Sequence, residues 1–392
     1  MNRKSIDPWK KDYTFGDINL GEVVYGWSDD KEDEPNEQTK PTTAGEETPS
    51  ESSGLQRVVC MIYNKGDNGD IEKKEFDAKY DACVAALDAI CGKKGRQIKL
   101  PKGKTAVNVK AYQWQGENGV MRLESAITVK KKGKSIMEFI RLTLAPDLAM
   151  LDKGNANDKV GRRDLRNNVT KDEDGTVWIK GIPMVDQGMK GYCVPATVAR
   201  VFAYYGMDKV DMHALAALCG TDSDGGTSTL KMQEALTAIG RNFHLKIKKL
   251  PDPPGTQADA LKEYNREAKR QGKTEVEMNT NGSWIKLVDP PLWAEARAKK
   301  SADVKKWMNP IRKSIDAGVP VLWSVYVSGF YNREGKEGGG AGGAHMRMII
   351  GYNVQENTII YSDSWGDWAT KRVMAMPEAF SVTSTTYVLN PS

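Results

Sequence analysis

The sequence predicts a mixed α+β protein with a smaller N-terminal domain and a larger C-terminal domain. Residues 55–150 show one stretch of helical spacing between strand-like stretches, in the order strand, helix and three strands. Residues 177–392 begin with helical periodicities and end with strand-like ones. Polar residues without periodicity separate the two parts, over 151–176. We therefore expect an antiparallel sheet covering one helix, followed by a domain with a helical lobe and an antiparallel sheet lobe.

The first 54 residues divide into two segments. Within 1–27, two short alternating runs on either side of Asn19 to Gly21 predict a short hairpin-like segment. Residues 28–54 consist mainly of Asp, Glu, Pro, Thr, Ser and Gly and contain almost no apolar side chain. Such a composition cannot bury enough apolar surface to order the chain, so this segment is predicted to be an acidic disordered linker.

The smaller domain combines one helix with four strands. Its helix is expected over 72–91, where the apolar residues at helical spacing are Phe76, Tyr80, Cys83, Val84, Leu87 and Cys91. Its strands are expected over 57–63, 105–115, 119–130 and 135–144.

The larger domain is expected to be helical first and strand-rich later. Apolar spacing predicts helices at 194–205, 212–219, 228–239, 258–270 and 304–317. Alternating or continuous apolar runs predict strands at 320–327, 346–354, 358–363, 371–375 and 385–389. A helical lobe followed by a sheet lobe would leave a cleft between them.

Composition excludes several classes of protein. The 392 residues are 28% charged and 39% hydrophobic with a net charge of +5, and no apolar run approaches the roughly 20 residues of a membrane span. The lysine runs flank predicted strands without interleaved aromatic residues, so no nucleic acid partner is expected. The basic N-terminus lacks the apolar stretch of a signal peptide. We expect an extracellular or periplasmic protein if a signal has been removed, and a cytoplasmic one otherwise.

Five cysteines are present, and four of them have no spacing typical of zinc sites or disulfides: Cys60, Cys83, Cys91 and Cys219. They are interpreted as small buried residues, and neither a metal nor a cofactor is expected. The fifth, Cys193, stands at the start of a predicted helix, where the unpaired amides and the helix dipole favour a thiolate.

Three further residues complete a site for acyl chemistry around Cys193. His345, at the start of a predicted strand, is a candidate base that accepts the thiol proton and returns it to a leaving amine. Asp363, at the end of the next strand, is expected to fix the orientation of the imidazole. Gln187 is a candidate donor of a side-chain amide to the oxyanion, together with the Cys193 backbone amide.

Other polar and aromatic residues compete with these assignments. His213 on a predicted helix and His244 on a predicted strand have no partner signature and are interpreted as structural. Asp367 is the alternative to Asp363, which is preferred because it ends a strand. Trp365 is interpreted either as a shield for the His345–Asp363 hydrogen bond or as a core residue. The glycines of 338–343 indicate a flexible loop.

These motifs carry a resemblance to a known family. The segments Pro183 to Gly206, Gly225-Gly-Thr, Ile315 to Val321, Ala344-His345 and Tyr361-Ser-Asp363 resemble the papain-like cysteine peptidases, particularly the bacterial branch related to bacteriocin-leader (double-glycine) peptidases. The resemblance covers residues 178–392. Gln187 lies six positions before Cys193, as the family's oxyanion glutamine does, and Asp363-Ser-Trp-Gly366 is similar to the family's Asn-Ser-Trp-Gly.

The resemblance implies a thiol peptidase that hydrolyses peptide bonds in a peptide or protein substrate through a Cys193 thioester. Val194 replaces the aromatic residue that follows the papain nucleophile, and 250–300 resembles an insertion, so substrate preference does not carry over. A transglutaminase-like acyl transferase on the same fold and a non-catalytic binding protein remain alternatives.

The smaller domain raises a separate hypothesis. Its element order is similar to the cystatin-like prodomains of some bacterial papain-like proteases. This similarity implies a zymogen with intramolecular inhibition, and Gly161-Arg-Arg163 in the polar linker is the expected region of cleavage. A substrate-docking or structural module on a solvated tether is the alternative.

Overall fold

The computed structural model describes residues 2–6, 13–28, 54–100, 107–129, 135–152, 164–188, 190–207, 212–221, 226–227, 229–279, 283–326 and 344–391. The chain divides into two units. The first consists mainly of Met1–Asn155 and includes Gly188–Gly191, and the second contains the remaining parts of Ala156–Ser392. Most of the expected acidic linker, all of 338–343 and Gly161-Arg-Arg163 lie outside the described residues.

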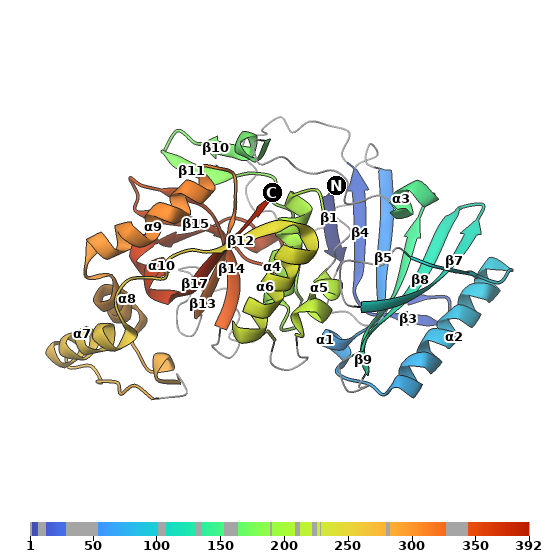
Figure 1. The fold of residues 1–392 in the computed structure, drawn as a ribbon, viewed down its shortest axis with the longest axis horizontal. Helices are drawn as coiled ribbons and strands as arrows, with labels where there is room; N and C mark the ends of the chain where they lie inside the picture. Colours follow the sequence, from blue (N-terminus) through green and yellow to red (C-terminus); the bar gives the residue numbers. More distant parts are fainter. Residues whose placement is uncertain are drawn as a thin grey trace. The chain divides into compact units, whose positions relative to one another are not determined.

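The first unit contains a seven-stranded antiparallel sheet in the order β1-β4-β5-β9-β8-β7-β6 (Figure 1). Its strands are β1 (Asn2–Ile6), β4 (Val23–Ser28), β5 (Gly54–Asn64), β6 (Arg96–Ile98), β7 (Val107–Gly116), β8 (Gly119–Val129) and β9 (Ser135–Ala145). A small hairpin of β2 (Tyr13–Phe15) and β3 (Ile18–Leu20) precedes β4. The residues before the acidic segment therefore form a hairpin and also contribute two strands to the main sheet.

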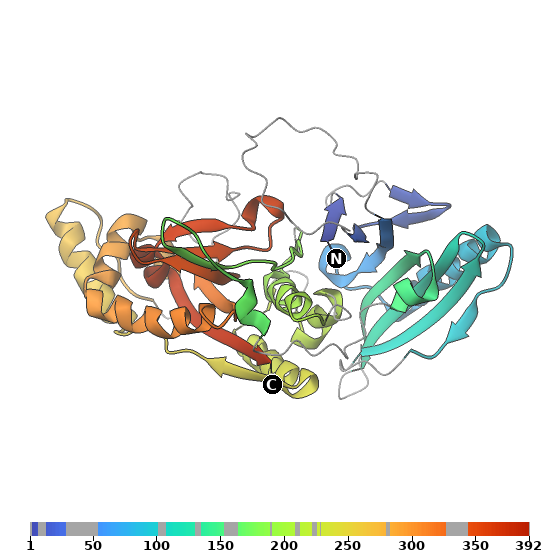
Figure 2. The same cartoon turned by 90° about the horizontal axis from the view of Figure 1, so that it is seen from above.

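Helix α2 (Lys73–Cys91) lies along this sheet and contacts β7, β8 and β9 (Figure 2). The side chains of Phe76, Tyr80, Cys83 and Leu87 are buried at the spacing that predicted the helix. Gly92 ends it in the left-handed conformation that glycine adopts without steric cost. Two short helices complete the unit, α1 (Lys65–Asn68) and α3 (Leu148–Asp152).

The second unit is built on a second antiparallel sheet, in the order β10-β11-β14-β13-β17-β12, with β15 paired to β14 and β16 paired to β15. The strands are β10 (Val169–Lys171), β11 (Thr176–Ile179), β12 (Leu245–Lys249), β13 (Val321–Tyr326), β14 (Ala344–Asn353), β15 (Thr358–Ser362), β16 (Arg372–Ala375) and β17 (Thr383–Pro391). The central strands β13 and β14 are almost entirely buried, which explains their continuous apolar sequences.

Helices of this unit follow the expected order with two additions. They are α4 (Cys193–Tyr204), α5 (Met212–Cys219), α6 (Thr229–Phe243), α7 (Gln257–Arg270), α8 (Pro290–Ala298), α9 (Ser301–Ile315) and α10 (Met376–Val382). Sequence patterns did not predict α8 and α10, because each is short and has a proline in its first turn. A proline is compatible with that turn, whose amides have no partner within the helix.

One hydrophobic core extends through the second unit and contains buried residues from both the helices and the sheet. Helix α4 packs on β14, and the Thr197 hydroxyl donates to the Met346 carbonyl oxygen across this contact. The structure is therefore mixed α+β, as the sequence predicted, and among the described residues the buried helix and sheet side chains of this unit belong to one cluster.

Part of the expected polar linker is folded. Asp164–Asn168 form a 3₁₀ helix, η1, and β10 pairs with β11, which in turn pairs with β14. Leu165 is completely buried in the core of the second unit. This single apolar anchor among Asn, Asp and Arg residues was too weak a pattern to predict order.

Among the helices in the described ranges, none has both the length and the apolar character of a bilayer span.

Candidate active site

Cys193 is the first residue of α4, and its side chain is partly buried. The carbonyl oxygen of Tyr192 accepts the first helical hydrogen bond, from the Ala196 amide at 2.8 Å. Pro195 occupies the first turn, where its missing N–H removes no helical bond. The thiol therefore lies at the positive end of the helix dipole, as the sequence predicted.

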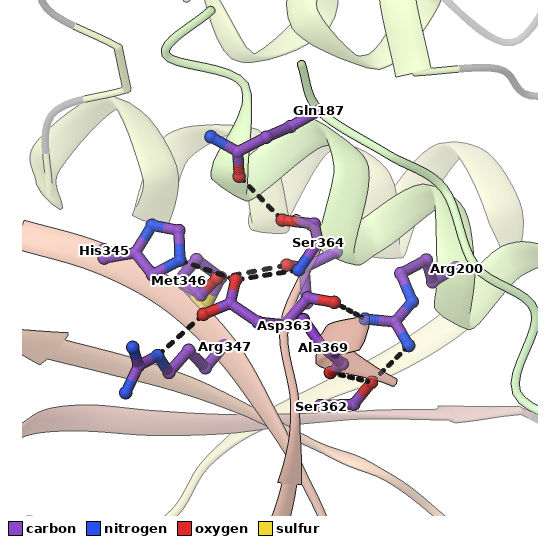
Figure 3. Close-up of polar contacts among 10 residues, drawn as sticks. Gln187, Arg200, His345, Met346, Arg347, Ser362, Asp363, Ser364 and Ala369 are labelled. Atoms are coloured by element: carbon purple, nitrogen blue, oxygen red, sulfur yellow. Dashed lines mark hydrogen bonds and ion pairs between the residues drawn. The ribbon is translucent and has the colours of Figure 1, made fainter. Parts of the chain in front are cut away.

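His345, the second residue of β14, lies close to two of the other predicted site residues. Its Nε2 atom is 2.7 Å from Oδ1 of Asp363 (Figure 3), and Cys193 is near enough to the ring to contribute to raising its pKa. The indole ring of Trp365 stacks on the imidazole with 4.6 Å between centroids and 23° between planes. The imidazole is thus held in one plane with a carboxylate on one nitrogen and the thiol nearby.

Asp363 follows β15 directly and is fixed through its backbone as well as its carboxylate. Its amide donates to the Ala369 carbonyl oxygen, and its carbonyl oxygen accepts from Nη1 of Arg200 at 2.8 Å. Oδ1 also accepts from the Ser364 amide at 2.7 Å, and Oδ2 accepts from Nε of Arg347 at 2.8 Å. These contacts leave the carboxylate little freedom to turn away from the imidazole.

Electrostatics favour a charged pair of His345 and Asp363. Burial lowers the pKa of His345, but the charge and hydrogen bond of Asp363, with a further contribution from Cys193, outweigh burial and raise this pKa to about 9. Burial raises the pKa of Asp363, yet the charges of His345 and Arg347 and the hydrogen bonds lower it to about 2. At neutral pH the ring is therefore an imidazolium that donates to a carboxylate.

Gln187 lies against Ser364, the residue that follows Asp363. Its backbone amide donates to the Ser364 carbonyl oxygen, and its side-chain Oε1 accepts from the Ser364 hydroxyl at 2.7 Å. Because Oε1 faces Ser364, the NH₂ group of the Gln187 amide is turned to the other side (Figure 3). The side-chain oxygen of Gln187 is thus held by the residue next to Asp363.

Two buried arginines that the sequence analysis did not select complete the surroundings of Asp363. Arg200 of α4 is completely buried and donates to the carbonyl oxygens of Pro183 and Asp363 and to Oγ of Ser362. Burial lowers its pKa to about 10. Arg347 of β14 is 1% exposed. Arg200 is the only charged residue of Thr-Val-Ala-Arg-Val-Phe, and Arg347 is the only charged residue of Met-Arg-Met-Ile-Ile. A charged residue in such an apolar stretch is a signal for a buried partner.

The competing residues are placed differently. Asp363, rather than Asp367, is the carboxylate hydrogen-bonded to His345, since Asp367 begins the 3₁₀ helix η3 (Asp367–Ala369). His213 is buried on α5, with its ring edge on Tyr192. His244 was expected on a strand, but it precedes β12 with a positive φ of 56°. Its side chain is exposed at this turn.

The remaining thiols are free, and three of them, Cys60, Cys83 and Cys219, are buried. Burial raises the pKa of Cys83 to about 11 and those of Cys60 and Cys219 to about 12. Within the part of the chain that the structure describes, no group of three or more His, Cys, Asp or Glu side chains is arranged to hold a metal ion.

Comparison with known proteins places this site in a family. The model of the Peptidase_C39 like family matches residues 179–388, which is more than half of the chain and includes all four predicted site residues. No curated protein matches the chain significantly. The family suggests a cysteine peptidase that acts on proteins. The chain belongs to the Peptidase_C39 like family of papain-like cysteine peptidases.

Proposed function

We propose that the chain is a cysteine peptidase in which Cys193 is the nucleophile, His345 the general base and acid, Asp363 the orienting carboxylate and Gln187 an oxyanion donor. The observation that carries this proposal is the placement of His345, whose Nε2 is hydrogen-bonded to Asp363 and whose pKa is raised by Asp363 and by Cys193 at the start of α4. A nucleophile, its base and the group that orients the base are the parts that covalent acyl transfer requires.

The reaction follows from these positions. The Cys193 sulfur, as thiolate, attacks the carbonyl carbon of the scissile bond, and negative charge develops on the carbonyl oxygen near the Gln187 amide. His345 gives its proton to the leaving amine as the C–N bond breaks, leaving a thioester on Cys193. A water molecule then loses a proton to His345 and attacks the thioester. The acid product leaves, and the thiolate and imidazolium are restored.

A labelling experiment tests the assignment. The full chain and a truncated chain starting at Asp164, which keeps η1 and β10, are treated with an epoxide inhibitor that alkylates activated thiols, beside Cys193→Ala and Cys219→Ala. Cys219 is the matched control because it is a buried thiol of the same unit. We expect labelling of wild type and Cys219→Ala and none of Cys193→Ala. Failure to label Cys193 in both the full and the truncated chain would contradict the peptidase assignment.

Cleavage of fluorescent casein separates hydrolysis from transfer. A peptidase releases new N-termini from casein in water alone. A transglutaminase-like enzyme would instead incorporate a fluorescent amine into glutamine side chains without cutting the backbone, because an amine resolves the same acyl-enzyme. A chain that binds casein but shows neither reaction would be a binding protein.

We further propose that the chain is made as a zymogen. Support comes from Gly188–Gly191, the segment between Gln187 and Tyr192 in the sequence, which groups with the first unit. Within this unit, the ammonium of Lys190 is completely buried and pairs with Glu22 at 3.3 Å and Asp67 at 3.0 Å. Burial lowers the pKa of Lys190, but the two carboxylates outweigh burial and raise it. A segment so anchored would restrict the adjoining Gln187 and Cys193 until the first unit is released.

Self-processing tests the zymogen. Wild type and Cys193→Ala are incubated, and the new N-termini are sequenced. Because Asp164–Lys171 are folded into the second unit, cleavage is expected between Asp152 and Asp164, where Gly161-Arg-Arg163 lies. Cleavage in wild type alone, accompanied by a rise in casein hydrolysis, is the expected result. An uncut wild type with full activity would rule out the zymogen.

A further inference from the structure

Arg347 and His345 share one carboxylate. They are two residues apart on β14, so their side chains leave the same face of the sheet. Both reach Asp363, His345 at Oδ1 with 2.7 Å and Arg347 at Oδ2 with 2.8 Å (Figure 3). Each oxygen of the Asp363 carboxylate therefore faces a different basic side chain.

Aromatic rings fix the guanidinium in this position. Its central carbon lies 4.9 Å from the ring centroid of Tyr361 and 5.9 Å from that of Trp365. Trp365 is also the ring that stacks on His345. The same indole thus contacts both basic groups, and Tyr361, on β15, is completely buried.

A purely structural explanation of Arg347 is weak. Its neighbours on β14 are Met346, Met348 and Ile349, all buried and apolar, and an apolar residue at this position would pack without the cost of desolvating a charge. The guanidinium forms an ion pair with the carboxylate that holds His345, so it acts on a charge that the proposed reaction uses.

We propose that Arg347 is a positioning residue for the peptidase reaction, which holds Oδ2 of Asp363 and limits how strongly this carboxylate retains the proton on His345. This inference rests on the proposed function. The imidazolium must give its proton to the leaving amine, and a carboxylate that bound it without a competing cation would make it a poorer acid. With Arg347 in place, Asp363 orients the ring while part of its charge is offset.

Other charged groups also act on this pair. Cys193 and Arg200 approach it from α4, and Arg200 donates to the backbone oxygen of Asp363 rather than to the carboxylate. Arg347 differs from Arg200 because its ion pair is with the carboxylate itself. Its removal should therefore change the titration of His345 in a direction that loss of packing would not.

The direction of the change separates the two roles. If Arg347 offsets part of the charge of the Asp363 carboxylate, removing Arg347 makes this carboxylate hold the proton on His345 more strongly. The His345 titration midpoint then rises. If Arg347 only maintains the packing, its removal loosens the His345–Asp363 pair, and the midpoint falls toward the ordinary histidine value of 6.5. The sign of the shift thus decides between them.

The experiment is an NMR titration of the full chain labelled with ¹⁵N-histidine. The chain has three histidines, so His213→Gln and His244→Gln assign the signals. All variants carry Cys193→Ala, which removes self-cleavage and the thiolate. We expect Arg347→Gln to raise the His345 midpoint by about one pH unit, the size of effect typical of a neighbouring charge. Arg347→Lys should restore most of the original midpoint, because it keeps the cation.

Two further variants make the test robust. Arg347→Met also removes the cation, and its side chain resembles the neighbouring strand residues, so it is expected to fold. The titration can then be read from this variant if Arg347→Gln does not fold. Arg141→Gln removes a half-buried arginine from Glu124 in the first unit and should leave the His345 midpoint unchanged. An unchanged or lowered midpoint in the folded Arg347 variants would overturn the proposal. The titration requires no hydrolysis. If the midpoint is raised but the protein with Cys193 in place does not cleave casein, the effect of Arg347 on the His345–Asp363 pair stands and the peptidase assignment is contradicted.

Discussion

The hydroxyl group of Ser364 donates to the side-chain oxygen of Gln187, with 2.7 Å between the two oxygens. The Gln187 backbone amide donates in return to the Ser364 carbonyl oxygen at 2.8 Å. Because Ser364 follows Asp363 directly, one short segment positions both the carboxylate that contacts His345 and the side-chain amide of Gln187, which have separate roles in the proposed reaction. The two functions are therefore coupled through neighbouring residues.

Ser364→Ala should slow casein hydrolysis without preventing it. Loss of the hydroxyl allows the Gln187 amide to turn, so we expect kcat to fall about tenfold while KM changes little, compared with about 100-fold for loss of the donor itself in Gln187→Ala. Ser381→Ala, which removes a buried hydroxyl from α10, is the control and should retain the wild-type kcat. Wild-type kcat in Ser364→Ala would contradict the coupling.

The activity should extend well above neutral pH. Asp363 raises the pKa of His345 to about 9, so the imidazolium persists to that pH, and the basic limb of kcat/KM for casein should have its midpoint near 9. Asp363→Asn keeps an orienting group but removes the charge, so the limb should move to lower pH. A wild-type limb near 6.5, the ordinary histidine value, would show that the pair is not charged.

The same pKa shifts predict how stability depends on pH. Because the pKa of His345 is raised on folding, its contribution is complete below about 6.5 and is lost as pH rises through about 9. Because the pKa of Asp363 is lowered on folding, its contribution is present above 3.8 and is lost as pH falls toward about 2. Urea unfolding of Cys193→Ala from pH 5 to 10 should show the loss of the His345 contribution to the free energy of unfolding. Asp363→Asn in the same background should lose less free energy of unfolding over this pH range, because Asp363 is the group that raises the His345 pKa.

Arg200→Met should destabilise the second unit strongly. The variant removes the donors for the carbonyl oxygens of Pro183 and Asp363 and leaves them buried, which we expect to cost about 3 kcal/mol in the free energy of unfolding. Arg270→Met is the matched control, since Arg270 is 72% exposed and its ion pair with Glu267 is an exposed contact. Arg270→Met should lower the free energy of unfolding by less than about 0.5 kcal/mol. Equal urea midpoints for the two variants would contradict this role of Arg200.

Gly318→Ala should prevent the close packing of η1 on the turn after α9. Gly318 has a φ of +74°, and a Cβ atom there would lie 2.0 Å from the Leu165 carbonyl oxygen. Gly272 has a similar φ of +66°, with nothing within 4 Å of its Cβ position. Gly272→Ala should therefore cost only the backbone strain of about 1–2 kcal/mol, and Gly318→Ala clearly more. Thermal unfolding of both variants measures the difference, and equal losses would show that Leu165 moves away freely.

Local patterns in the sequence predicted most elements of the second unit. The apolar spacing over 194–205 matches α4 to within one residue at each end, and 212–219 matches α5 at both ends. The patterns missed the short α8 and α10, which begin with prolines, and placed His244 on a strand. The positive φ of His244 is a property of the turn into β12, which alternation in the sequence does not indicate.

The candidate site was predictable in its order but not in all its parts. The spacing of Gln187 and Cys193, with His345 and Asp363 following, predicted residues that the structure brings into one group around His345 and Ser364. Arg200 and Arg347 were not predicted, because an arginine in an apolar run does not reveal which acceptor it meets. Asp363 lies 163 positions from Arg200 and 16 from Arg347.

The sequence by itself determined the mixed α+β class, the position of Cys193 at a helix start and the order of the four candidate site residues, because periodicity and helix termini are local properties of the chain. Only the tertiary structure decided which atoms meet: that Asp363 rather than Asp367 holds His345, that Ser364 turns the Gln187 amide, and that Arg347 takes the second carboxylate oxygen. Hydrogen bonds require atoms within about 3 Å, and the distances between residues far apart in sequence are set by the packing of α4, β14 and β15.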